Sequence, residues 1–340
     1  MIAKTPLLQS QDLTVGYRSG SKGRSRVAGP LNVEIYAGQL ICLLGPNGSG
    51  KSTLLRTLSG LQPALEGAVQ ISGIPAGKLR PPDLAKKISL VLTDSVRDSN
   101  LDAYSLVALG RYPYSGWLGT LSAADSEIIA WAIDAAHAGN LSDRKMATLS
   151  DGENQKVMLA RALAQDTPLM MLDEPTAHLD LPSRIQLMQL LHQLARQTRK
   201  GILISTHELD LALQVADEVW LLEEGGRLHT GSPEDLVLKG IFGAVFDKEG
   251  ILFDKATGTF RMYQGNGKYI GLTGEGPSVF WTKRALQRIG FTVTEVQPGS
   301  PGIRVTEENG QTTWALEYKG GEQKHDSISS LLSVLDDLSE

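Results

Sequence analysis

One short segment constrains the fold of this chain more than any other. Residues 45–52 read GPNGSGKS and match the pattern G-x-x-x-x-G-K-[ST] without deviation. The wholly apolar run Leu40–Leu44 precedes it, and leucines at helical spacing follow it between Thr53 and Leu61. A buried strand, a glycine turn and a helix are the context in which this pattern cradles phosphate. A glycine-rich turn with a chance Gly-Lys-Ser would not explain both flanks.

The residue types in this loop suit a nucleotide phosphate chain. Glycines let successive backbone N–H groups converge on phosphate oxygens, and the helix that follows presents its N-terminal dipole to the same anion. Lys51 would bridge the β- and γ-phosphates, and Ser52 would place its hydroxyl on Mg²⁺. The predicted nucleotide contacts in the loop are Gly45, Pro46, Asn47, Gly48, Ser49, Gly50, Lys51, Ser52 and Thr53.

A second element ends in two carboxylates. The apolar run Leu169–Leu172 reads as a buried strand, and Asp173 and Glu174 follow at its carboxyl end, where α/β sheets bind ligands. Asp173 suits a contact to Mg²⁺, and Glu174 suits a base that polarises the attacking water. An Asp-Glu pair alone would be read as a solvated strand end. Together with the phosphate loop, the pair predicts a catalytic and metal-binding function.

The periodicity downstream predicts an α/β core with a parallel sheet. Its expected strands and helices are Pro168–Leu172, Leu181–Gln197, Gly201–Ser205, Glu208–Val215 and Glu218–Leu222. Further strands are expected at Leu7–Tyr17 and Leu31–Ile35, with a hairpin tip at Ser19–Arg26. Two helices, Ala123–His137 and Asn154–Ala164, predict a separate helical lobe at about residues 100–165.

The composition shifts near Gly240, which predicts a first domain at residues 1–240 and a second at 241–340. The second domain is expected to be small and α+β, and the sequence assigns it no role. Its predicted strands and helices are Tyr269–Thr273, Phe280–Ile289, Thr292–Val296, Ile303–Glu307, Thr312–Tyr318 and Ser327–Leu338. The glycine-rich segment Gly271–Gly276 lacks the full spacing of a phosphate loop and is read as a plain loop.

These motifs, in this order, resemble those of the ATP-binding cassette (ABC) ATPases over Leu7–Leu238. The segment Leu149–Glu153, LSDGE, is similar to the family signature, with Asp151 as a mild departure. The resemblance implies a P-loop cassette with a mixed core sheet, an antiparallel β part and a helical lobe. It also implies ATP hydrolysis, in which Ser150, Asp151 and Gly152 point at the γ-phosphate of ATP bound by a second copy.

Other site residues follow from the same resemblance. Asp180 would act across the dimer, His207 would contact the γ-phosphate, and Tyr17 would stack on the adenine. The family has a glutamine where this sequence has Thr93, followed by Asp94, and either oxygen could meet Mg²⁺. On the residues alone, Tyr17 would be a strand tyrosine, and His207 would more often be structural.

Bulk properties limit the classes of partner. The net charge of −5 gives no positive field for nucleic acid, and no apolar stretch reaches the roughly 18 residues that span a bilayer. The chain is thus expected to be soluble and intracellular. The lone Cys42 fits a reducing compartment. Any membrane role must come from a partner.

The segment Tyr104–Gly119 is similar to the same region of the ATPase subunits of importers of iron–siderophore complexes, haem and cobalamin. In that family the region borders the groove that receives a cytoplasmic helix of the permease. Leu106, Leu109, Tyr112, Tyr114 and Trp117 could form such a surface or could equally pack inside the helical lobe.

The resemblance therefore implies the ATPase subunit of a bacterial importer at the cytoplasmic face of the inner membrane. It would form a head-to-tail homodimer that binds ATP and Mg²⁺, contacts integral membrane permease subunits, and acts indirectly with a substrate-binding protein. Two alternatives stay open: a soluble ABC ATPase acting on nucleic acid or ribosomes, and the ATPase subunit of an exporter.

Overall fold

The computed structural model describes residues 5–19, 23–92, 100–115, 119–246, 251–255, 257–262, 268–296, 300–308, 310–318 and 320–337. Contacts divide the chain into two units. The first comprises Met1–Phe246 with Lys255–Thr259, and the second comprises Asp247–Asp254 with Phe260–Glu340. The division falls a few residues after the boundary expected at residue 240.

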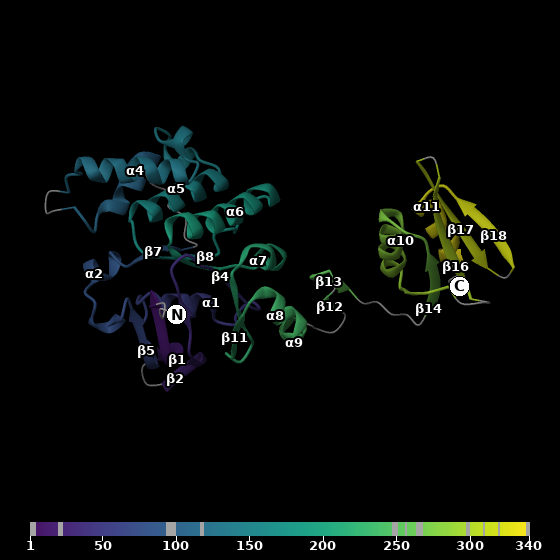
Figure 1. The fold of residues 1–340 in the computed structure, drawn as a ribbon, viewed down its shortest axis with the longest axis horizontal. Coiled ribbons are helices and arrows are strands. Elements are labelled where there is room, and N and C mark those ends of the chain that lie inside the picture. The colour runs from purple at the N-terminus through teal and green to yellow at the C-terminus, as the bar shows by residue number, and fades with distance from the viewer. Residues whose placement is uncertain are drawn as a thin grey trace. The chain divides into compact units, whose positions relative to one another are not determined.

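A mostly parallel sheet forms the core of the first unit (Figure 1). Its strands, in spatial order, are β11 (Leu228–Gly231), β10 (Glu218–Leu222), β4 (Leu40–Leu44), β9 (Gly201–Ser205), β8 (Leu169–Asp173) and β7 (Ile88–Val91). All neighbours pair in parallel except β10 and β11. Every residue of β4, β8 and β9 is buried, which explains their unbroken apolar runs.

Helices cover both faces of this sheet. Figure 1 shows α1 (Lys51–Leu58) on one face and α6 (Leu181–Thr198) on the other. Shorter helices complete the unit: α2 (Pro81–Ala85), α7 (Leu209–Val215), α8 (Pro233–Leu238) and α9 (Ile241–Phe246). The core is therefore the α/β arrangement expected from the sequence, although α2, α8 and α9 had not been anticipated.

An antiparallel part contains β1 (Leu8–Ser19), β2 (Gly23–Leu31), β3 (Glu34–Ile35), β5 (Glu66–Ile71) and β6 (Ile74–Pro75). A hairpin is present where its tip was expected at Ser19–Arg26, but the expected tip is too long, because Ser19 pairs with Gly23 and Gly16 with Arg26. The single strand expected at Leu31–Ile35 is wrong. β2 ends at Leu31, where the Asn32 side chain turns to accept the Asp12 N–H of β1 at 2.8 Å, and only Glu34–Ile35 forms a further strand.

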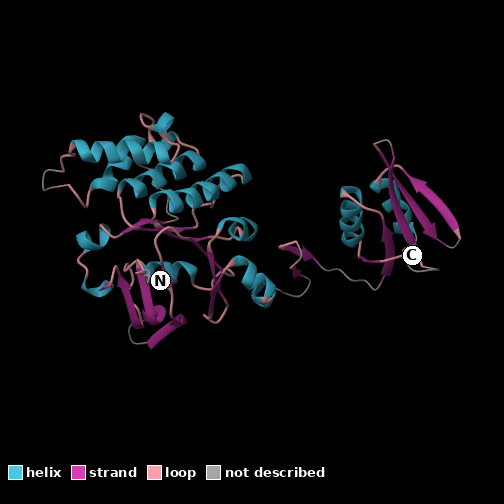
Figure 2. Ribbon diagram, viewed as in Figure 1, coloured by secondary structure: helices cyan, strands magenta, loops and turns pink. Residues whose placement is uncertain are grey.

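The helical lobe lies across the core sheet from the antiparallel part (Figure 2). It contains α3 (Ala103–Ala108), α4 (Ala123–Ala135) and α5 (Asp151–Ala164), with short 3₁₀ turns between them. α5 begins before the predicted Asn154 because Ser150 and Glu153 form a reciprocal capping box. α4 ends before the predicted His137, whose φ of 53° is not helical.

The second unit is a small α+β fold. Its sheet order is β15 (Phe291–Thr294), β14 (Lys268–Thr273), β16 (Gly302–Glu308), β17 (Gln311–Tyr318) and β18 (Gly321–His325). The helices α10 (Pro277–Arg288) and α11 (Ile328–Asp337) share an apolar core with this sheet, to which Ile270, Leu286 and Leu331 belong. A separate two-stranded ribbon pairs β12 (Ile251–Asp254) with β13 (Thr259–Met262). Within the described part of the chain, no helix combines the length and the apolar character that crossing a bilayer requires.

Candidate functional site

The phosphate loop connects β4 to α1, and its glycines are there for steric reasons. Gly45 has φ 153°, and a Cβ at this position would lie 2.3 Å from the Leu222 carbonyl oxygen. Gly50 has φ 105°, and a Cβ there would lie 2.1 Å from Cγ1 of Val27. These positions favour glycine both for their left-handed backbone and for the space beside them. Leu222 of β10 and Val27 of β2 therefore pack directly against the glycines of the loop.

Two side chains of the loop are adapted to an anion. Lys51 is buried, and its Nζ donates to the carbonyl oxygens of Gly45 at 2.9 Å and Pro46 at 3.1 Å. Burial lowers the pKa of Lys51, an effect opposed by the nearby charges of Glu174 and Asp173. The buried hydroxyl of Ser49 has no hydrogen-bond partner among the described residues. A buried cation and an unsatisfied hydroxyl fit a loop shaped to receive phosphate oxygens.

The first predicted acid lies beside this loop. Asp173, at the end of β8, accepts a hydrogen bond on Oδ1 from Ser52 Oγ at 3.2 Å and another from Ser205 Oγ at 2.6 Å. The structure thus brings together Ser52 and Asp173, the two residues that the sequence assigned to Mg²⁺. A hydroxyl and one carboxylate are oxygen ligands of the kind Mg²⁺ takes when phosphates and waters complete its shell. The described residues contain no group of three or more His, Cys, Asp or Glu side chains suited to a metal ion.

The second acid is held in an unusual backbone conformation. Glu174 has φ 51°, and its N–H donates to Ser205 O at 3.1 Å and to Ser205 Oγ at 2.9 Å. Its Oε1 lies 2.6 Å from Nε2 of His207, which follows β9. Non-glycine residues in the left-handed region cost free energy and concentrate at functional sites. The structure thus brings together Glu174 and His207, which lie far apart in the sequence.

Tyr17 lies against the helix of the phosphate loop. Its hydroxyl is 2.8 Å from the Thr53 Oγ1, while half of the residue surface, 51%, is exposed. An exposed ring tethered at the loop can offer its face to a planar base.

The signature residues and Asp180 form a different part of the surface. Ser150 caps α5, so that Asp151 and Gly152 lie in its first turn, and Asp180 caps α6 by accepting the Ser183 N–H at 3.1 Å. The Ser183 contacts lower the pKa of Asp180. Ser150, Gly152 and Ser183 line a cavity of about 550 Å³. Two further predicted site residues, Thr93 and Asp94, lie outside the described residues.

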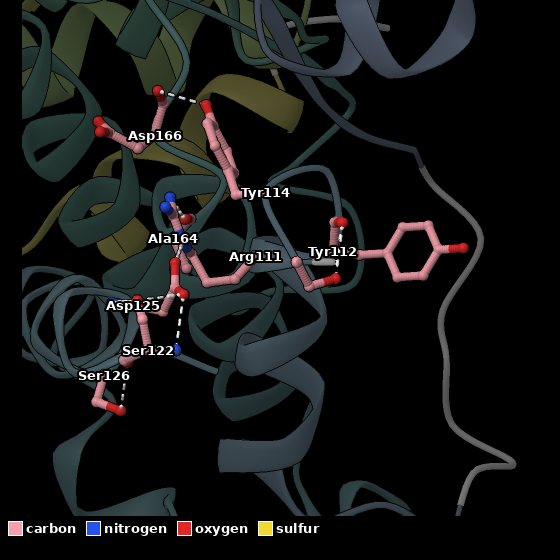
Figure 3. Close-up of polar contacts among 9 residues, drawn as sticks. Arg111, Tyr112, Tyr114, Ser122, Asp125, Ser126, Ala164 and Asp166 are labelled. Carbon is pink, nitrogen blue, oxygen red and sulfur yellow. Dashed lines mark hydrogen bonds and ion pairs between the residues drawn. The ribbon is translucent and has the colours of Figure 1, made fainter. Parts of the chain in front are cut away.

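The segment before α4 divides into buried and exposed side chains. Leu106 is buried, with 2% exposure, which excludes it from the surface suggested by its apolar character. Tyr104, Leu109 and especially Tyr112, at 76%, are exposed. Figure 3 shows the Tyr112 ring pointing away from the polar cluster behind it. Trp117 lies outside the described residues.

A buried ion pair supports this segment (Figure 3). Arg111 donates through Nε to Asp125 Oδ1 at 2.8 Å and through Nη1 to Ala164 O at 3.0 Å. Its guanidinium carbon lies 4.0 Å from the Tyr114 ring centroid. Arg111, which precedes Tyr112, is therefore bonded to the first turn of α4 and to the end of α5. These bonds hold the backbone beside the exposed Tyr112 ring in place.

The Asp125 carboxylate predicts a pH-dependent stability of the lobe. Hydrogen bonds from Ser122 and Arg111 lower the pKa of Asp125 from 3.8 to about 2. The stabilisation is therefore present above about pH 4 and is lost as the pH falls through 2. We expect Asp125→Asn to lower Tm at neutral pH and the difference from wild type to shrink toward pH 2. Thermal unfolding across this range measures it, and a difference that does not change with pH would contradict the ionic origin.

Comparison with known proteins defines the class. A family model described as ABC transporter matches residues 28–177, and one described as Iron ABC transporter C-terminal domain matches residues 266–336. The iron(3+)-hydroxamate import ATP-binding protein of Bacillus subtilis is 33% identical, over 70% of this chain and 87% of its own. The ferric enterobactin transport ATP-binding protein of Escherichia coli is 33% identical, over 73% of this chain and 89% of its own.

Solved structures agree. A dimeric ATP-binding cassette in a post-hydrolysis state with ADP and Pi is 27% identical, with a TM-score of 0.58, and the match covers 66% of this chain and 98% of that one. A metal-chelate type ABC transporter with 24% identity and a TM-score of 0.61 shares the fold. The chain belongs to the ABC transporter ATP-binding proteins. It binds ATP and is an ATPase, which confirms the expected fold class and activity.

The sequence did not single out Ser205. It was read as the last residue of a buried strand and as the start of the Ser205–His207 motif, in which only His207 received a role, although a hydroxyl at the end of the apolar run Ile202–Ile204 was a signal. The structure places that hydroxyl between the two acids of the site.

Proposed function

We propose that this chain is the ATP-hydrolysing subunit of a bacterial importer of iron chelates, of the siderophore or haem kind. The convergence of Ser52 with Asp173 and of Glu174 with His207 beside one phosphate loop carries the hydrolytic part of the proposal. The import part is supported by relatives named for ferric hydroxamate, ferric enterobactin and hemin, and by the iron-type C-terminal family match. These names favour iron chelates over cobalamin. No observation favours an exporter or a nucleic-acid partner.

In the proposed mechanism the loop from Gly45 to Thr53 binds the ATP phosphates. Lys51 would transfer its hydrogen bonds from the loop carbonyls to phosphate oxygens, and Tyr17 would stack on the adenine. Ser52 and Asp173 would hold Mg²⁺, which neutralises phosphate charge when bound. Glu174 would accept a hydrogen bond from the attacking water, and His207 would contact the γ-phosphate.

Ser150, Asp151, Gly152 and Asp180 would act on the ATP of a second copy packed head to tail. ATP would favour the closed pair by its differential affinity for the two states, and hydrolysis would loosen it. Thr93, or its neighbour Asp94, remains the proposed substitute for the family glutamine near Mg²⁺.

The exposed side chains of Tyr104, Leu109 and Tyr112, here called the Tyr112 surface, would contact a membrane permease. This contact would hold the chain at the cytoplasmic face of the inner membrane. Exposed aromatic and aliphatic side chains on a fixed base are typical of protein interfaces. A substrate-binding protein would act on this subunit only through the permease.

Tyr112→Asp tests this surface. We expect the basal ATPase rate to stay unchanged, because the ring lies outside the hydrolytic site, and the stimulation by permease to fall by about tenfold or more. The matched control is Tyr269→Asp, which alters an exposed tyrosine of the second unit. Normal stimulation of the Tyr112 variant would exclude this surface as the permease contact.

The test of function is the ATPase rate of the subunit assembled with the permease encoded beside its gene. We expect the rate to rise when a binding protein loaded with a ferric siderophore or haem is added, and not with the empty protein. An ATPase rate that changes neither with the permease nor with the loaded binding protein would contradict the import assignment.

A further inference from the structure

The hydroxyl of Ser205 occupies a particular place between the strands that carry the site. Ser205 is the last residue of β9 and is fully buried, and the strand register sets it opposite Asp173 of β8 and Leu43 of β4. Its Oγ donates to Asp173 Oδ1 at 2.6 Å and accepts the Glu174 N–H at 2.9 Å. One hydroxyl therefore bonds to both adjacent acids.

Packing alone does not call for a hydroxyl here. The preceding residues of β9, Ile202–Ile204, are apolar and buried, and a buried hydroxyl costs free energy unless it is hydrogen-bonded. In the same sheet the buried Ser89 of β7 has an Oγ without a partner among the described residues. Both serines are buried in strands of one sheet, but only the Ser205 hydroxyl is bonded to the two acids.

Each bond of Ser205 constrains one acid. At Glu174 it supports a left-handed backbone, φ 51°, that points the carboxylate at His207. At Asp173 it shares Oδ1 with Ser52, whose Oγ lies 3.2 Å away. If the Ser52 hydroxyl turns its oxygen toward a cation, Ser205 still donates to Asp173 and keeps the carboxylate oriented. Partners of this kind around metal ligands change metal affinity or activity by about 10–100-fold when removed.

We propose that Ser205 is a positioning residue for ATP hydrolysis, whose hydroxyl fixes the Asp173 carboxylate toward Mg²⁺ and the Glu174 turn toward the attacking water. This inference rests on the proposed roles of Asp173 and Glu174.

The experiment compares Ser205→Ala with Ser89→Ala, a change of the same atoms in the same sheet. The measurements are the steady-state ATPase rate, and the affinity for a fluorescent non-hydrolysable ATP analogue with Mg²⁺ and with EDTA. We expect Ser205→Ala to lower kcat by about 10–100-fold, and to raise KM for Mg²⁺-ATP in step with the weaker Mg²⁺-dependent binding. Its gain in nucleotide affinity from Mg²⁺ should fall by about tenfold, with the EDTA value unchanged. Ser89→Ala should match wild type in every measurement.

Ser205→Thr restores the hydroxyl and should recover most of the Mg²⁺-dependent gain. Thermal unfolding without nucleotide shows whether the added methyl group is tolerated, and if it is not, the Ser205→Ala and Ser89→Ala comparison decides alone. Wild-type kcat and Mg²⁺ dependence in Ser205→Ala would overturn the inference, as would an equal loss of affinity with Mg²⁺ and with EDTA. Asp173→Asn and Glu174→Gln separate the two proposals: if they too keep full activity, the assigned roles of the acids fail, and not only the role of Ser205.

Discussion

A Glu174→Gln variant is expected to hydrolyse ATP about 10²–10⁴-fold more slowly than wild type while still binding ATP. The amide has the size of the carboxylate and can still contact His207, which lies 2.6 Å from Oε1. It cannot accept a proton from the attacking water. Release of phosphate under saturating ATP gives the rate, and nucleotide titration gives the affinity.

A second Glu–His pair in the same unit provides the control. Glu223 Oε1 lies 2.5 Å from His229 Nε2 at the β10–β11 turn, outside the proposed hydrolytic residues. We expect Glu223→Gln to keep the wild-type rate. If Glu174→Gln also hydrolysed ATP at that rate, Glu174 would not be the base.

The same variant reports on the dimer. Because hydrolysis no longer removes the γ-phosphate, ATP should hold two copies of Glu174→Gln together, and analytical ultracentrifugation should detect their association. Absence of ATP-dependent association, both with and without the permease, would contradict the proposed head-to-tail arrangement.

Lys51→Met is expected to weaken ATP binding by about 30-fold or more. Lys51 is the buried cation of the phosphate loop, and methionine retains its length without its charge or donors. The variant would have no donor to transfer from the Gly45 and Pro46 carbonyl oxygens, now bound at 2.9 and 3.1 Å, to the phosphate oxygens. Equilibrium titration with a fluorescent ATP analogue measures the loss.

Lys200 offers a matched control for this substitution. It is also buried and directly precedes β9, and its Nζ donates to the Thr167 carbonyl oxygen at 2.7 Å. Lys200→Met should lower stability without changing ATP affinity in the protein that stays folded. Equal weakening of ATP binding by both variants would mean that Lys51 acts through folding and not through the phosphates.

Much of this site could be predicted because its signals are local. The phosphate loop fits one continuous pattern between a buried strand and a helix, and the apolar run before Asp173 identified its strand. Helix starts were missed by up to three residues because capping pairs such as Ser150 and Glu153 were not used. β18 was missed because Gly321–His325 is a polar strand, mostly exposed, whose place depends on its main-chain pairing with β17.

Non-local geometry limited the rest. Ser205 gains its function from the register of β9 against β8, which no short segment encodes. The exposure of Tyr112 and the burial of Leu106 depend on how the lobe packs around Arg111. The signature residues are proposed to complete a site only with a second chain, and such a contact between copies cannot be derived from the fold of one chain.

Uptake of a labelled ferric siderophore into vesicles shows whether ATP hydrolysis by this subunit drives import. The vesicles would contain the permease with this subunit and ATP on the subunit's side, and the loaded binding protein on the other. We predict ATP-dependent accumulation with wild type and with Glu223→Gln, and none with Glu174→Gln. Accumulation that continues with Glu174→Gln, or none with wild type beside full ATPase activity, would contradict the account.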